Sequence, residues 1–377
     1  MVSVEYKKLG DIATYINGYA FKPEQRGSEG LPIIRIQDLT GNAYDLGYYN
    51  GDYPKKVELN DGDVLISWSA SLGVYLWNHG KALLNQHIFK VVFDKVEIDK
   101  FYFMYAVEYN LDKMFLKTHG ATMKHITKKD FDNVVIPYPD LDYQKEVAYR
   151  LTSLKGIIEK YQKQLDLLDE LVKARFVEMF GDLRINDKGW KYYKLDELTE
   201  LITDGEHATP KRTTQGIYLL SARNVLNHQL SLEDVDFIDC DEFDRISRRI
   251  IPKEGDVLIS CSGSIGRCCI VPKNIKFQMV RSIALLRFKS NINPVFAEYM
   301  ITSDYLQNQI NKSKTASSQA NLFQGKIKSL KGVVPPLELQ NQFASFVQEI
   351  DKSRSRIQKS LEASQELFDS LMQEYFG

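Results

Sequence analysis

Side chains that can hydrogen-bond to nucleic-acid bases concentrate in a few polar loops of this chain. Arginine and lysine pair with guanine, and asparagine and glutamine pair with adenine, in the major groove of DNA. The first half of the chain offers Lys22, Arg35, Gln37, Ser69, His87, Lys124 and His125 as candidate DNA-binding residues. The second half offers His207, Lys211, Arg212, Arg223, Asn224, Ser262, Ser318 and Gln319. Together these loops predict a surface that reads base sequence. Any single residue among them has a simpler explanation: a loop cation can be merely solvated, and a loop histidine can merely hydrogen-bond within its own loop.

The sequence carries no signature of a catalytic centre. A Gly-x-x-x-x-Gly-Lys-Ser/Thr phosphate loop, a Gly-x-Gly-x-x-Gly dinucleotide fingerprint, a Gly-x-Ser-x-Gly nucleophile elbow and a His-Glu-x-x-His zinc helix are all missing. The four cysteines lie in the second half without a Cys-x-x-Cys pair, and a structural zinc site needs four converging ligands. We therefore predict a non-catalytic protein without a metal site. A nuclease that acts alone is the enzyme alternative.

The chain contains the same set of motifs twice. Gly-Asp-Val-Leu-Ile-Ser occupies residues 62–67 and again residues 255–260. Pro-Asp-Leu-Asp-Tyr-Gln at 139–144 corresponds to Pro-Pro-Leu-Glu-Leu-Gln at 335–340, and Phe-Gly occurs at 180–181 and at the C-terminal end. A repeat about half the chain long is typical of a duplicated domain and not of a solenoid.

Each copy shows the same predicted order of elements. A short helical segment (6–16; 192–202) is followed by runs rich in branched and aromatic residues, which predict strands at 33–36, 64–67 and 88–93 and at 218–220, 257–260 and 283–288. A helix (101–115; 295–310) and a final Val-Val-x-Pro strand complete each copy. The loops differ between the copies while the strands agree, as expected if one scaffold carries two specificities.

A long heptad pattern follows each copy. Residues 144–180 contain no proline, and their apolar side chains recur at alternating spacings of four and three. Arg354 and Ser364 interrupt the equivalent pattern in the second copy. The residues predicted to pair the two helices, or to bind a partner, are Leu151, Leu154, Ile158, Leu165, Leu168, Val347, Ile350, Ile357 and Leu361. About 37 helical residues extend roughly 55 Å; an ordinary core helix is the alternative.

These motifs, in this order and in duplicate, resemble the specificity subunit of type I restriction-modification systems over the full length. Asp-Gly-Glu-His-Ala-Thr-Pro at 204–210 also resembles a recurrent turn of such domains, whereas the first copy departs from it with Asn-Gly-Tyr-Ala-Phe-Lys-Pro at 17–23. The resemblance implies an α+β fold with two homologous α/β target-recognition domains, two long antiparallel coiled-coil helices and a pseudo-two-fold internal repeat. The implied divisions are recognition domain 1 (1–141), spacer helix 1 (142–182), recognition domain 2 (183–337) and spacer helix 2 (338–377).

The resemblance also implies a function. The chain is expected to read a bipartite asymmetric site in double-stranded DNA and to direct two adenine-N6 methyltransferase (modification) subunits and restriction/translocase subunits to it. S-adenosylmethionine, ATP and Mg²⁺ are expected on those partners, and no cofactor in this chain. A type II system with a fused nuclease-methyltransferase partner, and a coiled-coil scaffold that binds no DNA, are the alternatives.

Composition is compatible with these expectations. The 49 basic and 50 acidic residues give a net charge of −1, which argues against non-specific binding of polyanions as the main task. Phosphate contacts can come from other subunits of a larger complex. No apolar run is long enough to span a membrane and no signal peptide is evident, so a cytoplasmic protein is expected.

Overall fold

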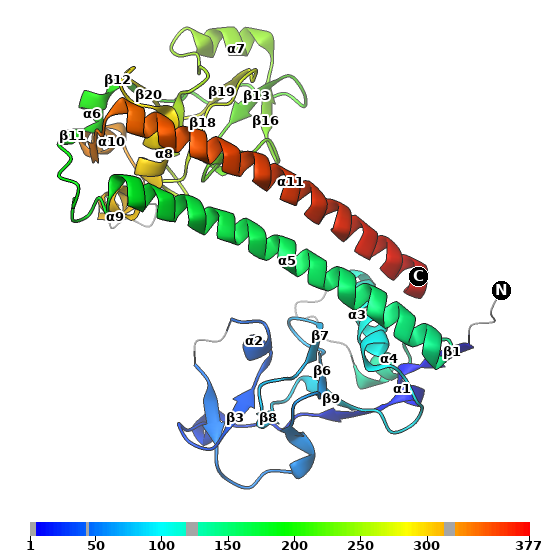
Figure 1. The fold of residues 1–377 in the computed structure, drawn as a ribbon. Coiled ribbons are helices and arrows are strands. Elements are labelled where there is room, and N and C mark those ends of the chain that lie inside the picture. The colour runs from blue at the N-terminus through cyan, green and yellow to red at the C-terminus, as the bar shows by residue number, and fades with distance from the viewer. Residues whose placement is uncertain (1–4, 43–44, 118–126, 313–320) are drawn as a thin grey trace. The chain divides into compact units, whose positions relative to one another are not determined.

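The computed structural model describes residues 5–42, 45–117, 127–312 and 321–377, and its contacts divide the chain into two compact units. The first unit comprises residues 1–163 and 358–377, and the second comprises residues 164–357. Two 40-residue helices, α5 (Leu141–Phe180) and α11 (Leu337–Phe376), therefore each belong to both units (Figure 1). Each helix begins one residue before its predicted spacer segment. Helix α5 ends two residues, and α11 one residue, before the predicted end.

The first unit contains two four-stranded sheets. The first sheet is antiparallel, in the order β2 (Thr14–Asn17), β9 (Ile88–Val92), β6 (Val64–Ser67) and β7 (Gly73–Leu76). The second sheet has the order β4 (Gly47–Tyr49), β3 (Leu31–Ile34), β8 (Ala82–Leu84) and β5 (Glu58–Leu59), and its β3–β8 pair is parallel. The remaining strands, β1 (Glu5–Lys8) and β10 (Val135–Tyr138), pair with each other. The shorter α-helices are α1 (Leu9–Ile12), α2 (Ile36–Leu39), α3 (Lys100–Lys117) and α4 (Lys128–Asp132), and 3-10 turns occur at Pro23–Gln25 and Lys55–Val57.

The second unit repeats this topology. Its antiparallel sheet has the order β12 (Thr199–Asp204), β20 (Ile283–Phe288), β17 (Val257–Ser260) and β18 (Cys268–Ile270). Its second sheet has three strands in the order β16 (Asp236–Ile238), β13 (Ile217–Leu220) and β19 (Phe277–Met279), and its β13–β19 pair is parallel like β3–β8. The other strands are β11 (Tyr192–Lys194) with β21 (Lys331–Val333), and β14 (Val225–Leu226) with β15 (Gln229–Leu230). The helices are α6 (Leu195–Leu198), α7 (Cys240–Ser247), α8 (Pro294–Thr302), α9 (Asp304–Lys312) and α10 (Gln324–Ser329).

Equivalent residues play equivalent parts in the two units. Ser67 and Ser260 end the identical hexapeptides, and both are fully buried. Their hydroxyl groups donate to the carbonyl oxygens of Ser71 (2.5 Å) and Ser264 (2.6 Å). These serines therefore close the loop that follows each strand. The duplicated α+β fold predicted from the sequence is confirmed.

Two local predictions need correction. The segments predicted as helical at 6–16 and 192–202 contain only the four-residue helices α1 and α6, each between two strands. Leu9 and Ile12 are fully buried as the helical spacing predicted, but β1 and β2 pair with distant strands, and these long-range hydrogen bonds determine the conformation. The helix predicted at 295–310 is divided into α8 and α9 at Ser303, whose backbone is extended.

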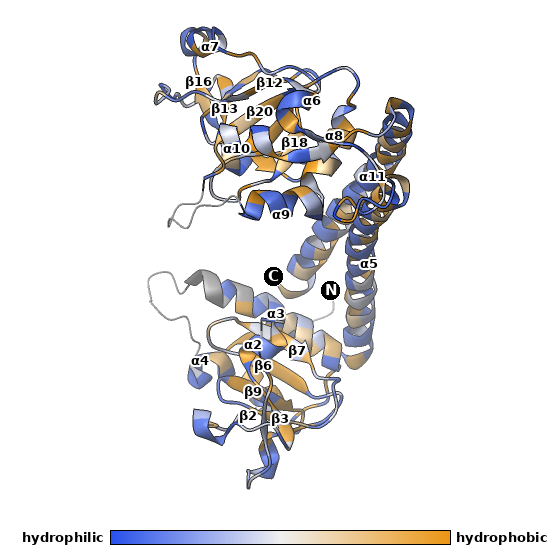
Figure 2. Ribbon diagram, turned by 90° about the vertical axis from the view of Figure 1, so that its left-hand side faces the viewer, coloured by the Kyte–Doolittle hydropathy of each residue, from blue (hydrophilic) through white to orange (hydrophobic). Residues whose placement is uncertain are grey.

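The long helices complete the hydrophobic core of each unit. In the first unit, Val147 and Leu151 of α5 share a core with Met372 and Phe376 of α11. In the second unit, Phe176 and Phe180 of α5 share a core with α11, where the Phe180 and Phe343 ring centroids lie 5.5 Å apart. Thus the start of one helix packs beside the end of the other within each unit, which makes them antiparallel. Along both helices apolar and polar residues are interspersed, whereas strands such as β6 and β20 consist largely of apolar residues (Figure 2).

Candidate nucleic-acid interface

Three predicted residues lie in the loop that follows β12 in the second unit. The His207 ring nitrogen Nε2 lies 2.8 Å from a carboxylate oxygen of Asp204. The backbone N–H of Lys211 donates to Glu242 at 3.1 Å, while the Lys211 side chain extends from an exposed position. Arg212 Nε donates to Asp236 at 3.0 Å. The loop is therefore held by hydrogen bonds and ion pairs, and it presents basic groups to solvent.

The next two predicted residues have contrasting environments. Arg223 is half-exposed, and its guanidinium nitrogens lie 3.3 Å from Asp236 and 3.6 Å from Asp234. Asn224 is fully buried. Its Oδ1 accepts from the Ser221 backbone N–H at 2.9 Å, and its Nδ2 donates to two backbone carbonyl oxygens. The prediction for Asn224 is corrected, because an amide buried and bonded in this way cannot pair with an adenine.

Ser262 lies in the loop between β17 and β18 and is half-buried. Its backbone forms an isolated antiparallel bridge with Asn321. Two residues further along, Phe323 occupies the N-cap of α10 without a side-chain hydrogen bond, and 62% of its surface is exposed. Sequence reasoning missed Phe323. The available signal was an aromatic residue where the first copy has Thr127, which caps α4 through a hydrogen bond from the Asp130 N–H.

In the first unit Arg35 is bound to its own loop. Its Nε and Nη2 donate to the two carboxylate oxygens of Asp38 at 3.0 and 3.2 Å, and Nη2 also donates to the carbonyl oxygen of Asp45. Only 11% of the Arg35 side chain is exposed. A bidentate pair of this kind fixes the guanidinium and occupies donors that would be needed for a guanine. In this structure Arg35 therefore stabilises the loop.

The other described candidates of the first unit are more accessible. Lys22, Gln37 and His87 are exposed, and Ser69 is half-buried. The backbone φ of His87 is +72°, and its ring lies 5.0 Å from the indole of Trp68 in an edge-on arrangement. Lys124, His125, Ser318 and Gln319 lie outside the described residues.

Two further arginines of the second unit were missed by sequence reasoning. Arg245, in α7, and Arg249, just after it, both contact the loop that follows β12. Both side chains are partly exposed. No sequence signal marked them, because Arg245 lies 39 residues from Glu206 and Arg249 lies 45 residues from Asp204. Helix α7 also has no counterpart in the repeat pattern.

The residues predicted to pair the helices lie on the less exposed side of α5 and α11. Leu151, Leu154, Leu165 and Val347 are buried, and Ile158, Leu168, Ile350, Ile357 and Leu361 are half-buried. Other apolar side chains of α5 remain exposed. Tyr149 and Ile157 do so in the first unit, and Leu167 and Leu171 in the second. Their exposure leaves apolar surface available to other proteins.

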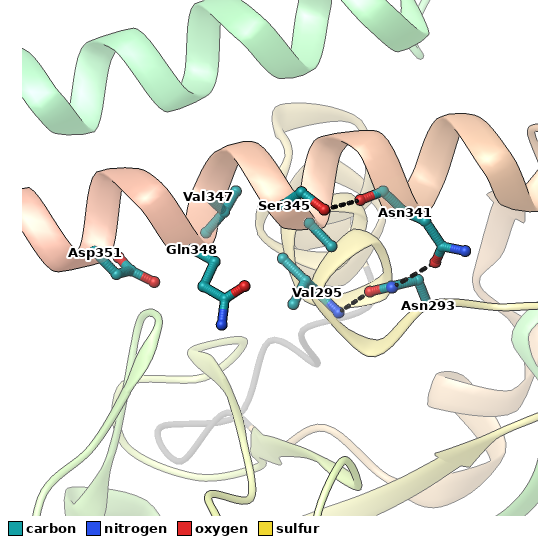
Figure 3. A pocket seen from close by; sticks show the side chains of 8 residues that line it. Asn293, Val295, Asn341, Ser345, Val347, Gln348 and Asp351 are labelled. Atoms are coloured by element: carbon teal, nitrogen blue, oxygen red, sulfur yellow. Dashed lines mark hydrogen bonds between the residues drawn. The ribbon is translucent and has the colours of Figure 1, made fainter.

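A shallow groove lies beside α11 in the second unit. Its volume is about 490 Å³, and its lining comes from the start of α8 and from α11. The Asn293 amide donates to Asn341 Oδ1 at 2.9 Å, and the Ser345 hydroxyl donates to the Asn341 carbonyl oxygen at 3.0 Å (Figure 3). The lining therefore combines amide, hydroxyl and carboxylate groups with the apolar side chains of Val295, Ala344 and Val347.

Within the part of the chain that the structure describes, no group of three or more histidine, cysteine, aspartate or glutamate side chains converges on a point that could hold a metal ion. None of its helices is long and apolar enough to cross a lipid bilayer.

Known proteins show the same architecture and related sequences. The EcoBI specificity subunit of the type I restriction enzyme from Escherichia coli is 24% identical, over 94% of this chain and 80% of that protein. The MjaVIII specificity subunit of a type I restriction enzyme from Methanocaldococcus jannaschii is 23% identical, over 94% of this chain and 89% of that protein. These relatives favour a type I specificity subunit over the type II alternative.

Solved structures agree in fold. The crystal structure of a type I restriction-modification S subunit from M. genitalium matches with a TM-score of 0.61 at 14% identity, over 100% of this chain and 96% of that one. A chain from a structure that concerns complex assembly and conformational transition of the type I R-M system gives a TM-score of 0.56, also at 14% identity. The match covers 99% of this chain and 97% of that one.

The family profile itself matches twice, once in each copy. The type I restriction modification DNA specificity domain is recognised at residues 1–168 and again at residues 187–365. Together with the duplicated topology, these two matches show that the chain belongs to the family of type I restriction-modification DNA specificity subunits.

Proposed function

We propose that this chain reads two separate parts of one asymmetric DNA target, one with each recognition domain. The observation that carries the proposal is the pair of antiparallel sheets, β2-β9-β6-β7 and β12-β20-β17-β18, which share one strand order. The loop after the first strand differs in chemistry between the two. A shared scaffold with different loops is suited to recognising two different sequences.

The contrast between the two loops is specific. After β2, Tyr19 and Phe21 pack edge to face with centroids 4.9 Å apart, and Phe21 also packs against Tyr49 at 5.2 Å. After β12, the equivalent loop is held by ion pairs such as Arg249–Asp204 at 2.7 Å. Phe21 is buried and supports the exposed Tyr19, whose ring would offer an apolar contact to thymine methyl groups. The charged loop after β12 would instead offer donors to guanine.

We further propose that the chain is not catalytic and that its partners perform the chemistry. Modification subunits would bind S-adenosylmethionine and take the target adenine out of the DNA stack, which costs a few kcal/mol. Restriction subunits would use ATP and Mg²⁺. The chain would supply part of the binding energy by contacting both parts of the target, and its activity on cellular DNA would place it in the cytoplasm.

The long helices would also offer surfaces to those partners. The exposed Leu167 and Leu171 in the second unit, and Tyr149 and Ile157 in the first, are apolar contacts of the kind that central regions of interfaces bury. A 40-residue helix extends about 60 Å. Helices of this length would set the number of unread base pairs between the two parts of the target.

Methylome sequencing tests the proposal. The chain and its cognate modification subunit are expressed together in a host without other DNA methylation. We expect methylated adenines within one asymmetric sequence of two specified parts separated by an unspecified spacer of fixed length. A single uninterrupted motif, or methylation that does not depend on this chain, would contradict the proposal. Binding of the modification subunit without any DNA recognition would support the scaffold alternative.

A further inference from the structure

Helix α7 is an addition that distinguishes the second recognition domain from the first. It lies between β16 and β17, with Asp239 as its N-cap. In the first unit, the chain between β4 and β6 forms only a 3-10 turn (Lys55–Val57) and the two-residue strand β5. Phe243 and Ile246 of α7 are buried against strands β13 and β16, so the apolar side of the helix covers the second sheet. Its polar side chains take no part in this core and need an explanation of their own.

The side chains of α7 and of the residues after it converge on one loop, residues 204–213. Glu242 is almost completely buried, and its Oε1 accepts from the Lys211 backbone N–H at 3.1 Å. Arg245 Nη1 donates to Glu206 at 3.4 Å. Arg249 donates to Asp204 at 2.7 Å and to the Gly205 carbonyl oxygen at 3.2 Å. Four residues of the loop therefore form hydrogen bonds with side chains of α7 or of the residues that follow it.

Glu242 is the centre of this arrangement. Besides the Lys211 N–H, it accepts two hydrogen bonds from Arg245, Nη2 to Oε1 and Nε to Oε2, both at 2.9 Å. These bonds lower the pKa of Glu242 to about 2, so it stays ionised at physiological pH. Bidentate charge-assisted pairs fix both partners in orientation. The carboxylate therefore joins α7 to the backbone of the loop at the residue whose basic side chain extends outward.

We infer that α7 is a specificity element of the second recognition domain and that Glu242 is a positioning residue, which holds Lys211 in register for the DNA. This inference rests on the proposed function, because it assumes that the 204–213 loop reads one part of the target. Glu242 itself touches no base. It acts by restricting the positions that Lys211 and its neighbours adopt, and preorganisation of this kind affects discrimination more than overall folding.

The test uses the intact complex with its modification subunits and a DNA library randomised in both parts of the target. Glu242→Gln keeps the size of the side chain and removes the charge that holds Arg245. Glu254→Gln is the matched control, because Glu254 pairs at 3.3 Å with the exposed Lys273 in the same unit. Sequencing of the methylated products gives the discrimination at every position, and exchange of residues 183–337 identifies the part of the target read by this domain.

We expect Glu242→Gln to lower discrimination about tenfold in that part of the target, within the range of a lost base contact, and to change the other part less than about twofold. Amide hydrogen exchange at Lys211 should become faster in the same variant. If Glu242→Gln does not fold, Arg245→Lys keeps the charge, removes the bidentate geometry, and is expected to give the same result.

The other outcomes separate a failure of this inference from a failure of the proposed function. Unchanged discrimination, or an equal loss in both parts of the target, would overturn the role of α7. If the complex without substitutions shows no bipartite preference, the proposed function fails and this inference falls with it. A clear preference that Glu242→Gln leaves intact refutes only the inference.

Discussion

The side-chain amide of Gln340 bonds to the backbone of Asn293, with Oε1 accepting the Asn293 N–H at 2.8 Å. The other end of the same amide donates to the Pro335 carbonyl oxygen at 2.8 Å. Gln340 is fully buried and thereby ties the start of α11 to the N-cap of α8. Gln144 makes the same two bonds in the first unit, to the Asp99 N–H at 2.9 Å and to the Pro139 carbonyl oxygen at 2.8 Å. This explains why both copies of the proline-leucine motif end in glutamine.

Replacing Gln340 should destabilise the protein. Gln340→Leu fills a similar volume but leaves the Asn293 N–H without its partner, and such a loss costs about 1–3 kcal/mol. We expect a lower urea midpoint. Gln348→Leu, at an exposed position of the same helix, is the control and should unfold at nearly the original midpoint. Equal midpoints for the two variants would contradict a structural role of the buried amide.

Exchange of one recognition domain should change one part of the target. Residues 1–141 are replaced by the equivalent segment of another member of the family, and the methylome is sequenced. Because each unit has its own hydrophobic cores and sheets, we expect one specified part to change and the other to be retained. A simultaneous change in both parts would refute the model of two independent readers.

Removal of a loop cation should reveal what it contacts. Lys211→Ala and Arg223→Ala truncate exposed or half-exposed side chains and should leave the fold intact. A base contact predicts a loss of about 1–3 kcal/mol and relaxed specificity at one position. A phosphate contact predicts equal weakening on all DNA sequences. It also predicts that the slope of log affinity against log salt concentration becomes smaller by about one. Methylation rates at several salt concentrations distinguish these results. Lys273→Ala is the control, and wild-type rates for both loop variants would exclude them from the interface.

The cysteines should differ sharply in reactivity. Cys240 is exposed, whereas Cys261, Cys268 and Cys269 are buried. Burial raises the pKa of Cys261 to about 12 and also raises the pKa of Cys268 and Cys269. Since the thiolate is the reactive form and a raised pKa keeps the thiol protonated at pH 8, these three should react slowly. A thiol reagent should modify one cysteine rapidly in the folded protein and four in denaturant. Rapid modification of Cys268 in the folded protein would contradict its burial.

The sequence by itself determined the duplication, most of the strands and the two long helices. These features are local or periodic. Heptad spacing identifies a helix and its buried side because side chains four and three residues apart share one face. The identical hexapeptides ending at Ser67 and Ser260 marked equivalent strands, and the same hydrogen bond closes the loop after each.

Only the tertiary structure decided which polar side chains face solvent. Asn224 and Lys211 look equally suited to DNA in sequence, yet the first is buried and bonded to the loop around it, and the second has an exposed side chain. The hydrogen bond between Glu242 and Lys211 joins residues that are 31 positions apart in the sequence. The bond between Arg249 and Asp204 joins residues that are 45 positions apart. No local pattern encodes such pairs, because the partner of a polar group depends on which distant segments the folded sheets bring beside it.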